Sequence, residues 1–236
     1  MENPSPEAAQ VREIRQLLRQ VDACLRVRRE LRGAQHESVG LSDVYWHLDN
    51  MHPALNVVVP RRNTAYVPIG DVQRGLHRLR ELGRPARLQY IEGLFPTQYR
   101  DQIQAAGLRP EVRVPLALRP LTSEQPVSFT HSHEHRVTRE VGDMLCVEVG
   151  HPQQPIGLAR LGLGAEAAYI NLLEWRDQTG LEALLHTVMT AAHEADATLL
   201  ILPDAPARQS AWGSVLSGMG FIIEGFLITC MDGNDV

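Results

Sequence analysis

The feature that most constrains the fold of this chain is a pattern of elements that occurs twice. The segments ARLQYIEGLFPTQYRDQIQAAGLRPEVRVPLAL (86–118) and ATLLILPDAPARQSAWGSVLSGMGFIIEGFLITC (197–230) each read as a strand, a proline-containing turn, a helix, a glycine corner and a second strand. Gly107-Leu108 in the first segment corresponds to Gly220-Phe221 in the second. Self-similarity of this kind predicts two related α/β units within one chain.

Hydrophobic periodicity supplies the remaining elements. We expect helices over 6–32, 71–82, 96–106, 181–195 and 207–218, and strands over 56–59, 86–91, 112–118, 143–149, 156–163, 167–175, 198–202 and 222–230. The first helix is long and amphipathic, with arginines mostly away from its apolar stripe. Those arginines form either a phosphate-binding stripe or a solvated face, and the acidic residues interleaved at pairing distances favour the solvated face.

Composition restricts the class of protein. The chain has 236 residues, of which 44% are hydrophobic, so it is long enough for one large domain or two small ones. All 23 basic residues are arginine, and the net charge of -5 disfavours binding to nucleic acid. No apolar run reaches the roughly 18 residues that span a bilayer, and the N-terminal sequence MENPSPEAAQ lacks a signal-peptide pattern. We therefore expect a cytoplasmic protein with neither a nucleic-acid nor a membrane partner.

The segment EWRDQTGLEALLHTV (174–188) has the outline of a strand end, a tight glycine turn and an amphipathic helix. Chains often bind a pyrophosphate at such a turn, because backbone N–H groups converge there and the helix dipole favours an anion. An alternative needs no ligand: Thr179 caps the helix, and Glu182 completes a capping box three residues later.

The second half of the chain resembles the GNAT superfamily of acyl-CoA-dependent N-acetyltransferases. The resemblance rests on the order of its elements, on the strand "TLLIL", and on "LSGMGF", which is similar to the "LYxxLGF" corner of the family. It implies an α/β (α+β) fold: a mixed, mostly antiparallel sheet flanked by helices, in two related units. The implied domains are an N-terminal amphipathic helix (1–40), a truncated GNAT-like unit (41–120) and a GNAT-like acyltransferase unit (121–236).

The resemblance also implies a cofactor site for acetyl-CoA or another acyl-CoA. The family loop, Q/R-x-x-G-x-G/A, falls on residues 177–182, where only Gly180 matches and where Asp177 and Glu182 place carboxylates beside the expected pyrophosphate. Arg176 can compensate, since a guanidinium suits phosphate. The implied cofactor-binding positions are Leu173, Arg176, Gln178, Thr179, Gly180 and Leu181.

The chemistry implied by the resemblance is attack of an amine on a thioester, which requires a base and an acid. Glu174, at the end of the predicted fourth strand of this half, is the best-placed base, although it can equally be a solvent-facing strand residue. The position of the family's tyrosine acid falls on Leu216, so that proton donor is absent.

Two polar stretches are candidates for contacts with the acceptor. In "THSHEHR" (130–136), His131, His133 and His135 alternate, so an extended strand would place them on one face about 6 to 7 Å apart. Metal binding, substrate contact and a polar surface all remain open for them; we predict no metal and assign His133 to the substrate site. In "VYWHLDNMHP" (44–53), Tyr45 and Trp46 either line a substrate pocket or belong to a capped turn against the core.

Two functions follow. The first is a GNAT-type N-acyltransferase that transfers an acetyl or other acyl group from acyl-CoA to a small-molecule or peptide amine. The alternative is a catalytically inactive GNAT-like binding or scaffold protein, favoured by the departures at Asp177, Glu182 and Leu216. Pairing of two chains into a homodimer through edge strands stays open.

Overall fold

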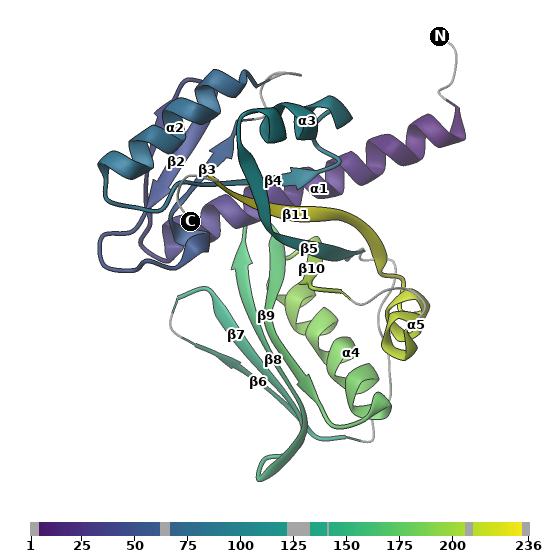
Figure 1. Ribbon diagram of the computed structural model, residues 1–236. Helices are drawn as coiled ribbons and strands as arrows, with labels where there is room; N and C mark the ends of the chain where they lie inside the picture. Colours follow the sequence, from purple (N-terminus) through teal and green to yellow (C-terminus); the bar gives the residue numbers. More distant parts are fainter. Residues whose placement is uncertain (1–4, 62–66, 122–132, 141, 206–209, 233–236) are drawn as a thin grey trace. The chain divides into compact units, whose positions relative to one another are not determined.

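The computed structural model describes residues 5–61, 67–121, 133–140, 142–205 and 210–232 (Figure 1). The chain divides into two compact units: unit 1 consists of Met1–Arg28 and Pro115–Glu224, and unit 2 of Arg29–Val114 and Gly225–Val236. Neither unit is a single stretch of sequence. The ranges 1–40, 41–120 and 121–236 stay a prediction about where related sequence begins and ends.

Unit 1 is a sheet with helices packed against it. Its strands follow the order β6-β7-β8-β9-β10-β5, and all neighbouring pairs with a defined register are antiparallel except β9 and β10, which are parallel. The elements are most of α1 (Pro6–Leu31), the end of β5 (Leu108–Pro120), β6 (His135–Arg139), β7 (Met144–His151), β8 (Gln154–Gly164), β9 (Ala167–Trp175), α4 (Gln178–Glu194), β10 (Leu199–Pro203), α5 (Ala211–Gly218) and the start of β11 (Ile222–Asp232).

The core of unit 1 lies between the sheet and α4. Leu184 and Val188 of the helix are fully buried in one cluster with Leu161 and Ile170 of the strands. On the sheet's other face, the Arg28 guanidinium of α1 lies 4.2 Å from the centre of the Tyr169 ring, a cation–π contact. Glycines of β8 admit this side chain, because a Cβ on Gly162 would lie 2.7 Å from the Arg28 Nε.

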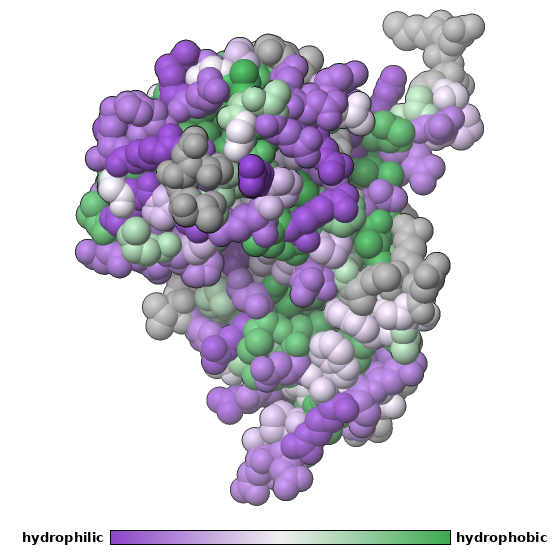
Figure 2. Space-filling model, viewed as in Figure 1, coloured by the Kyte–Doolittle hydropathy of each residue, from purple (hydrophilic) through white to green (hydrophobic). Residues whose placement is uncertain are grey.

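Unit 2 repeats the same construction on a smaller scale. Its strand order is β1-β2-β3-β4-β11-β5, and β3 and β4 form its parallel pair. The elements that lie wholly within it are β1 (Gln35–Val39), β2 (Ser42–Trp46), the short 3-10 helix η1 (Pro53–Leu55), β3 (Val57–Pro60), α2 (Ile69–Glu81), β4 (Arg87–Glu92) and α3 (Thr97–Ala105). The exposed side of α2 is mainly hydrophilic, as expected for an amphipathic helix (Figure 2).

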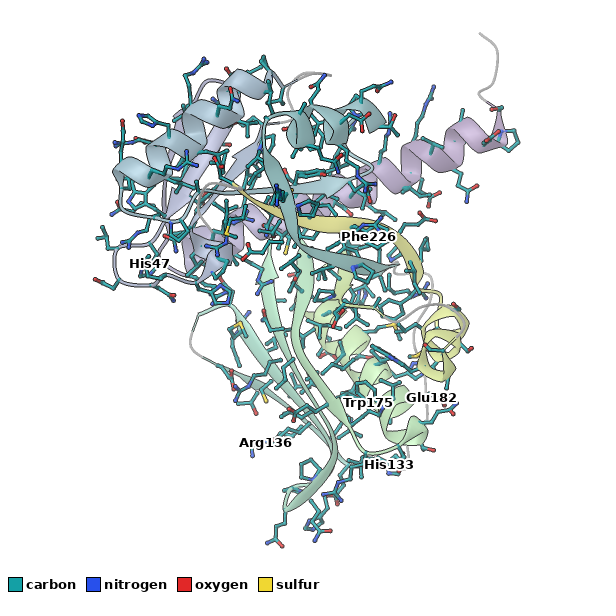
Figure 3. All side chains as sticks on the ribbon, viewed as in Figure 1. His47, His133, Arg136, Trp175, Glu182 and Phe226 are labelled. Atoms are coloured by element: carbon teal, nitrogen blue, oxygen red, sulfur yellow. The ribbon has the colours of Figure 1, made fainter. Side chains whose placement is uncertain are left out.

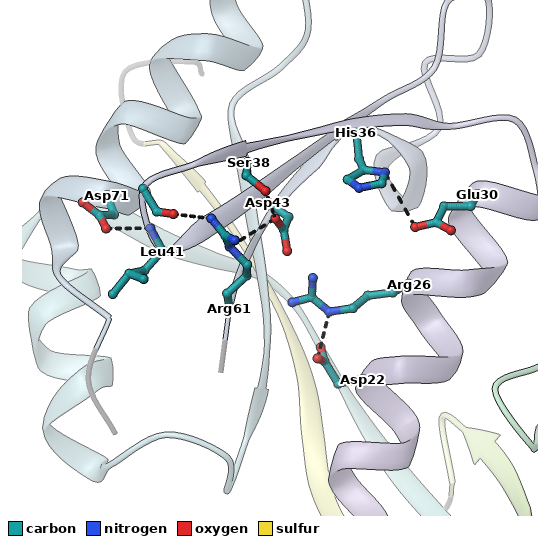
Figure 4. Close-up of polar contacts among 10 residues, drawn as sticks. Asp22, Arg26, Glu30, His36, Ser38, Leu41, Asp43, Arg61 and Asp71 are labelled. Carbon is teal, nitrogen blue, oxygen red and sulfur yellow. Dashed lines mark hydrogen bonds and ion pairs between the residues drawn. The ribbon is translucent and has the colours of Figure 1, made fainter. Parts of the chain in front are cut away.

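The turn between β1 and β2 is held by polar contacts (Figure 4). The backbone amide of Leu41 donates to the Asp71 carboxylate at 2.7 Å, at the start of α2. Asp43, which is only 7% exposed, pairs with Arg61 at 3.3 Å and accepts from the Ser38 hydroxyl at 2.9 Å. The first turn of α2 therefore anchors the hairpin through the Asp71 carboxylate.

The two halves of the sequence have the same order of elements. In the second half the chain runs β9–α4–β10–α5–β11, and in the first half it runs β3–α2–β4–α3–β5. The strand beside β10 is β5, from the first half of the sequence, and the strand beside β4 is β11, from the second half. Each half thus contributes a strand to the other half's unit. This confirms the prediction of two related units with a mixed, mostly antiparallel sheet and flanking helices.

Most predicted elements are present, with ends shifted by a few residues, and β9 has the predicted bounds. The hairpin of β1 and β2 was not anticipated, because QHESV is polar and its side chains are mostly exposed. No helix among the described residues is long and apolar enough to cross a membrane.

Candidate acyl-CoA site

The parallel pairing of β9 and β10 in unit 1 is short. The two strands are paired over only three residues, Leu199–Ile201 against Ala167–Tyr169. After that, β9 continues for six residues to Trp175, and α4 follows it closely. We call the part of unit 1 between these two strands beyond Tyr169 and Ile201 the wedge; α4 begins at Gln178, three residues after β9 ends.

A β-bulge in β9 sets the direction of the side chains beside the wedge. Leu161 of β8 is opposite Ile170, but the next residue, Arg160, is opposite Leu172, so Asn171 is the extra residue. The core-facing positions of β9 shift accordingly, from Ala168 and Ile170 to Leu173. The side chain of Asn171 is held by the Arg28 guanidinium, which donates to its amide oxygen.

The N-terminus of α4 is capped by Asp177. This residue has an extended backbone (φ -147°, ψ 176°), and its carboxylate accepts a hydrogen bond from the Gly180 amide at 2.8 Å. The expectation that Thr179 caps the helix in a capping box with Glu182 is wrong. Glu182 instead accepts from the side-chain amide of Gln178 at 3.1 Å.

Two amide donors of the first turn remain available. Helix geometry gives the Gln178 and Thr179 amides no partner within the helix, and among the described residues no acceptor lies on either of them. Both side chains are exposed, as is Arg176. The donors that an anion can reach here are therefore two backbone amides and one guanidinium, beside the Asp177 carboxylate.

Gly180 has a packing role. A Cβ at this position would lie 3.0 Å from the carbonyl oxygen of Ile156 in β8. Gly157 makes the reciprocal approach, since its Cβ would lie 3.1 Å from Leu184 of α4. The one residue that matches the family loop thus lets the helix start lie directly on β8.

Trp175 and Trp212 connect the end of β9 with the start of α5. Trp175 ends β9, Trp212 lies in the first turn of α5, and their ring centres are 5.0 Å apart with planes tilted by 44°. The Trp175 side chain remains 36% exposed (Figure 3). This aromatic pair therefore lies at the wide end of the wedge, partly open to solvent.

Glu174 points to the sheet face opposite α4. Its cross-strand partner is Leu158, whereas its neighbour Leu173 lies opposite Ala159 and packs into the core beneath α4. Glu174 is exposed, so a water or substrate can reach its carboxylate. On the same face, Arg160 pairs with Glu140 at 3.6 Å. Partial burial raises the pKa of the Cys146 thiol, and the nearby carboxylates of Glu140 and Glu148 raise it further.

Three other sequence-predicted positions of unit 1 serve the core. Leu173 packs against the α4 cluster, and Leu181 is 1% exposed. The Arg176 backbone amide donates to the Ile156 carbonyl at 3.0 Å, which fixes the turn that leads into α4. Leu216, at the position of the family tyrosine, is fully buried in α5 and has no group that can donate a proton.

The predicted acceptor residues lie in different units. Tyr45 belongs to the core of unit 2, is 2% exposed, and has the Arg29 guanidinium 5.1 Å from its ring centre. Trp46 packs against the core of unit 2. The turn that follows is capped, because the His47 ring nitrogen accepts from the amides of Asp49 and Asn50, both at 3.1 Å.

His133 belongs to unit 1, just before β6, and is partly exposed, while His135 is exposed on β6 (Figure 3). His131 lies outside the described residues. Within the described ranges, no three histidine, cysteine, aspartate or glutamate residues are grouped so that they could hold a metal ion.

Comparison with solved structures identifies the fold. A GCN5-related N-acetyltransferase from Kribbella flavida is 15% identical, with a TM-score of 0.70 over 92% of this chain and 95% of that one. One from Sphaerobacter thermophilus is 14% identical, with a TM-score of 0.53 over 93% and 92%. A tandem GNAT protein from the clavulanic acid biosynthesis pathway is 10% identical, with a TM-score of 0.51 over 80% and 78%.

No protein-family model matches the sequence, and the search of curated proteins gives no match. The structural matches define the class of the chain as a GNAT fold. The two units with exchanged strands, and the likeness to a tandem GNAT protein, make it the tandem form of this fold. The predicted resemblance to the GNAT superfamily is thereby confirmed at the level of fold.

Proposed function

We propose that this protein is an N-acyltransferase that uses acetyl-CoA or another acyl-CoA, and that unit 1 carries the site. The observation that carries the proposal is the wedge between β9 and β10, which ends at the first turn of α4. A thioester chain in the wedge would place its pyrophosphate at that helix start, where backbone amides and the helix dipole favour an anion.

The residues present fit this cofactor in part. The Gln178 and Thr179 amides can donate to phosphate oxygens, and Arg176 can add a charge-assisted hydrogen bond. Asp177 opposes them, because its carboxylate already holds the Gly180 amide and repels an anion. We therefore expect binding that is weaker than in a loop without this carboxylate.

In the proposed reaction, Glu174 accepts a proton from the acceptor ammonium, directly or through water. The amine nitrogen then bonds to the acyl carbon, the carbon–sulfur bond breaks, and the sulfur leaves as a thiolate while the nitrogen loses its second proton to water. Leu216 cannot return a proton to this sulfur, so solvent water supplies it. The exposure of Glu174 on the face opposite α4 supports approach of the amine from that side.

The acceptor in this proposal is a small-molecule or peptide amine, with His133 as a substrate contact in unit 1. Tyr45 and Trp46 remain predictions for acceptor binding; the burial of Tyr45 favours a structural role for its ring.

We retain the predictions of a cytoplasmic location and of neither nucleic-acid nor membrane partners. A homodimer stays an open proposal.

Two observations favour a second candidate function, that of a catalytically inactive binding or scaffold protein. The Asp177 carboxylate already accepts the hydrogen bond from the Gly180 amide that a bound anion would need. The contact between Trp175 and Trp212 narrows the wide end of the wedge. Both features would persist in a chain that keeps the GNAT fold without the reaction.

Thermal unfolding with acetyl-CoA, combined with a turnover assay, separates the two functions. At a ligand concentration 100-fold above its dissociation constant, binding adds about 2.7 kcal/mol to the free energy of unfolding and raises the melting temperature by several degrees. Glu174→Gln should keep this shift and lose acyl transfer to a panel of amines, whereas Glu166→Gln, an exposed carboxylate in the β8–β9 turn, should keep both. Absence of a melting shift would favour the scaffold function.

A further inference from the structure

A pocket of about 840 Å³ lies in unit 1, where α1 passes the C-terminal end of α4. This volume is within the range of about 300 to 1,000 Å³ that is typical of small-molecule sites. The helix α4 has 17 residues, so its two ends are about 25 Å apart. The pocket is therefore distant from Glu174 and from the candidate acyl-CoA site at the other end of this helix.

The floor of the pocket is apolar. It consists of Leu17 from α1, Pro120 and Leu121 at the end of β5, and Ala197 before β10. Leu17 and Ala197 are only 8% and 3% exposed, so the partly buried Pro120 and Leu121 present most of the apolar surface that a ligand can cover. Such a surface gains free energy when it covers an aliphatic segment of a ligand.

The rim of the pocket is polar and acidic. It carries the carboxylates of Glu13 and Asp196 together with the His193 imidazole, and no arginine is among the described residues that line it. The C-terminal end of α4 adds a partial negative charge at the same place, because the helix macrodipole has its negative pole there. The lining thus favours a cation and disfavours an anion.

Asp196 occupies a position that usually belongs to glycine. Its φ is +60°, and it follows α4 in a Schellman motif: its amide donates to the His193 carbonyl, and the Ala197 amide donates to the Ala192 carbonyl, both at 3.0 Å. Glycine would adopt this conformation with less strain. The chain therefore keeps a carboxylate at the pocket where backbone geometry prefers a residue without a side chain.

We propose that this pocket binds an aliphatic amine as its ammonium form, with the carbon chain on the apolar floor and the charged group beside Glu13 and Asp196. A linear diamine suits the lining best, since two carboxylates are present. An amine bound here is too far from Glu174 to be the acceptor, so the inference does not depend on acyl transfer.

Calorimetric titration of the full chain with 1,6-diaminohexane tests the proposal, with hexanoate as the probe of opposite charge. We expect saturable binding of the diamine and none of hexanoate. Glu13→Gln and Asp196→Gly should each weaken diamine binding about threefold, and together about tenfold, because each removes one charge-assisted contact at an exposed rim. Asp196→Gly suits the conformation of the Schellman motif, so a loss of binding would not reflect misfolding.

The matched control is Glu194→Gln, which removes a carboxylate from the last turn of α4 outside the pocket lining and should leave diamine affinity unchanged. Three results would each overturn the proposal: no diamine binding up to about 10 mM, a concentration at which even a millimolar ligand saturates; equal binding of hexanoate; or equal weakening by Glu194→Gln.

Discussion

Asp177 is the residue whose replacement should change cofactor affinity most directly. Its carboxylate caps α4 by accepting from the Gly180 amide at 2.8 Å, and the amides of Gln178 and Thr179 lie in the same turn. Asp177→Asn keeps a good N-cap and removes the charge. The change should cost less than about 1 kcal/mol of folding stability, the part that the carboxylate gains from the helix dipole.

The magnitude follows from the distance between the two anionic groups. A pyrophosphate held by these amides would lie about 6 Å from the carboxylate and carry about two negative charges, so the repulsion at the dielectric constant of water is about 1.4 kcal/mol. Asp177→Asn should therefore lower the dissociation constant for acetyl-CoA about tenfold at low salt.

Isothermal titration at low and high ionic strength measures this effect. The tenfold gain should shrink as salt is added, because the two charges are exposed to solvent. Glu194→Gln removes the same charge about 25 Å away, beyond the screening length of about 10 Å, and should change nothing. If Asp177→Asn and the unaltered protein bind acetyl-CoA equally at low salt, the placement of the pyrophosphate beside α4 is wrong.

Three further predictions concern packing, the aromatic pair and pH. Gly180→Ala should lower the free energy of unfolding by about 1 to 3 kcal/mol, because the new Cβ would lie 3.0 Å from the Ile156 carbonyl oxygen. Gly218 of α5 has open space around it, so Gly218→Ala should not destabilise the protein. Urea unfolding of both variants checks this. In a Trp46→Phe background, Trp175 and Trp212 are the remaining tryptophans, and titration with acetyl-CoA should change the tryptophan emission; constant emission at saturating ligand would show that neither ring lies at the site. Burial raises the pKa of the Cys24 and Cys230 thiols from 9.0 to about 11, so the folded state holds these protons more tightly than the unfolded state. The free energy of unfolding should therefore fall as the pH rises from 9 to about 11. Unfolding midpoints that stay level across this pH range would contradict this prediction.

The sequence predicted the elements of unit 1 well because their signals are strong and local. The strand β9 is a mostly apolar run bounded by Gly164 and Gly180, and the apolar stripe of α4 has helical spacing. The repeat of strand, helix and strand in 86–118 and 197–230 was also visible in the sequence. The exchange of β5 and β11 between the units was not, because strand pairing over this separation leaves no local pattern.

The details of the site were harder to predict. Asp177 and Thr179 are both good N-cap residues, and only the contact of α4 with β8 decides that the helix starts after Asp177. The bulge at Asn171 did leave a signal that was missed: the apolar alternation of Ala168 and Ile170 changes phase and resumes at Leu173. The polar hairpin of β1 and β2 was not predicted, because hydrogen bonds to the buried Asp43, and not apolar periodicity, hold Asp43 in place.

The central claim is that the first turn of α4 binds the pyrophosphate of an acyl-CoA. NMR of the backbone amides tests it most directly. Titration of the ¹⁵N-labelled protein with acetyl-CoA should shift the backbone amides of Gln178 and Thr179 strongly, with much smaller changes at the C-terminal end of the same helix near His193. Unchanged chemical shifts of the Gln178 and Thr179 amides at saturating acetyl-CoA would contradict this claim.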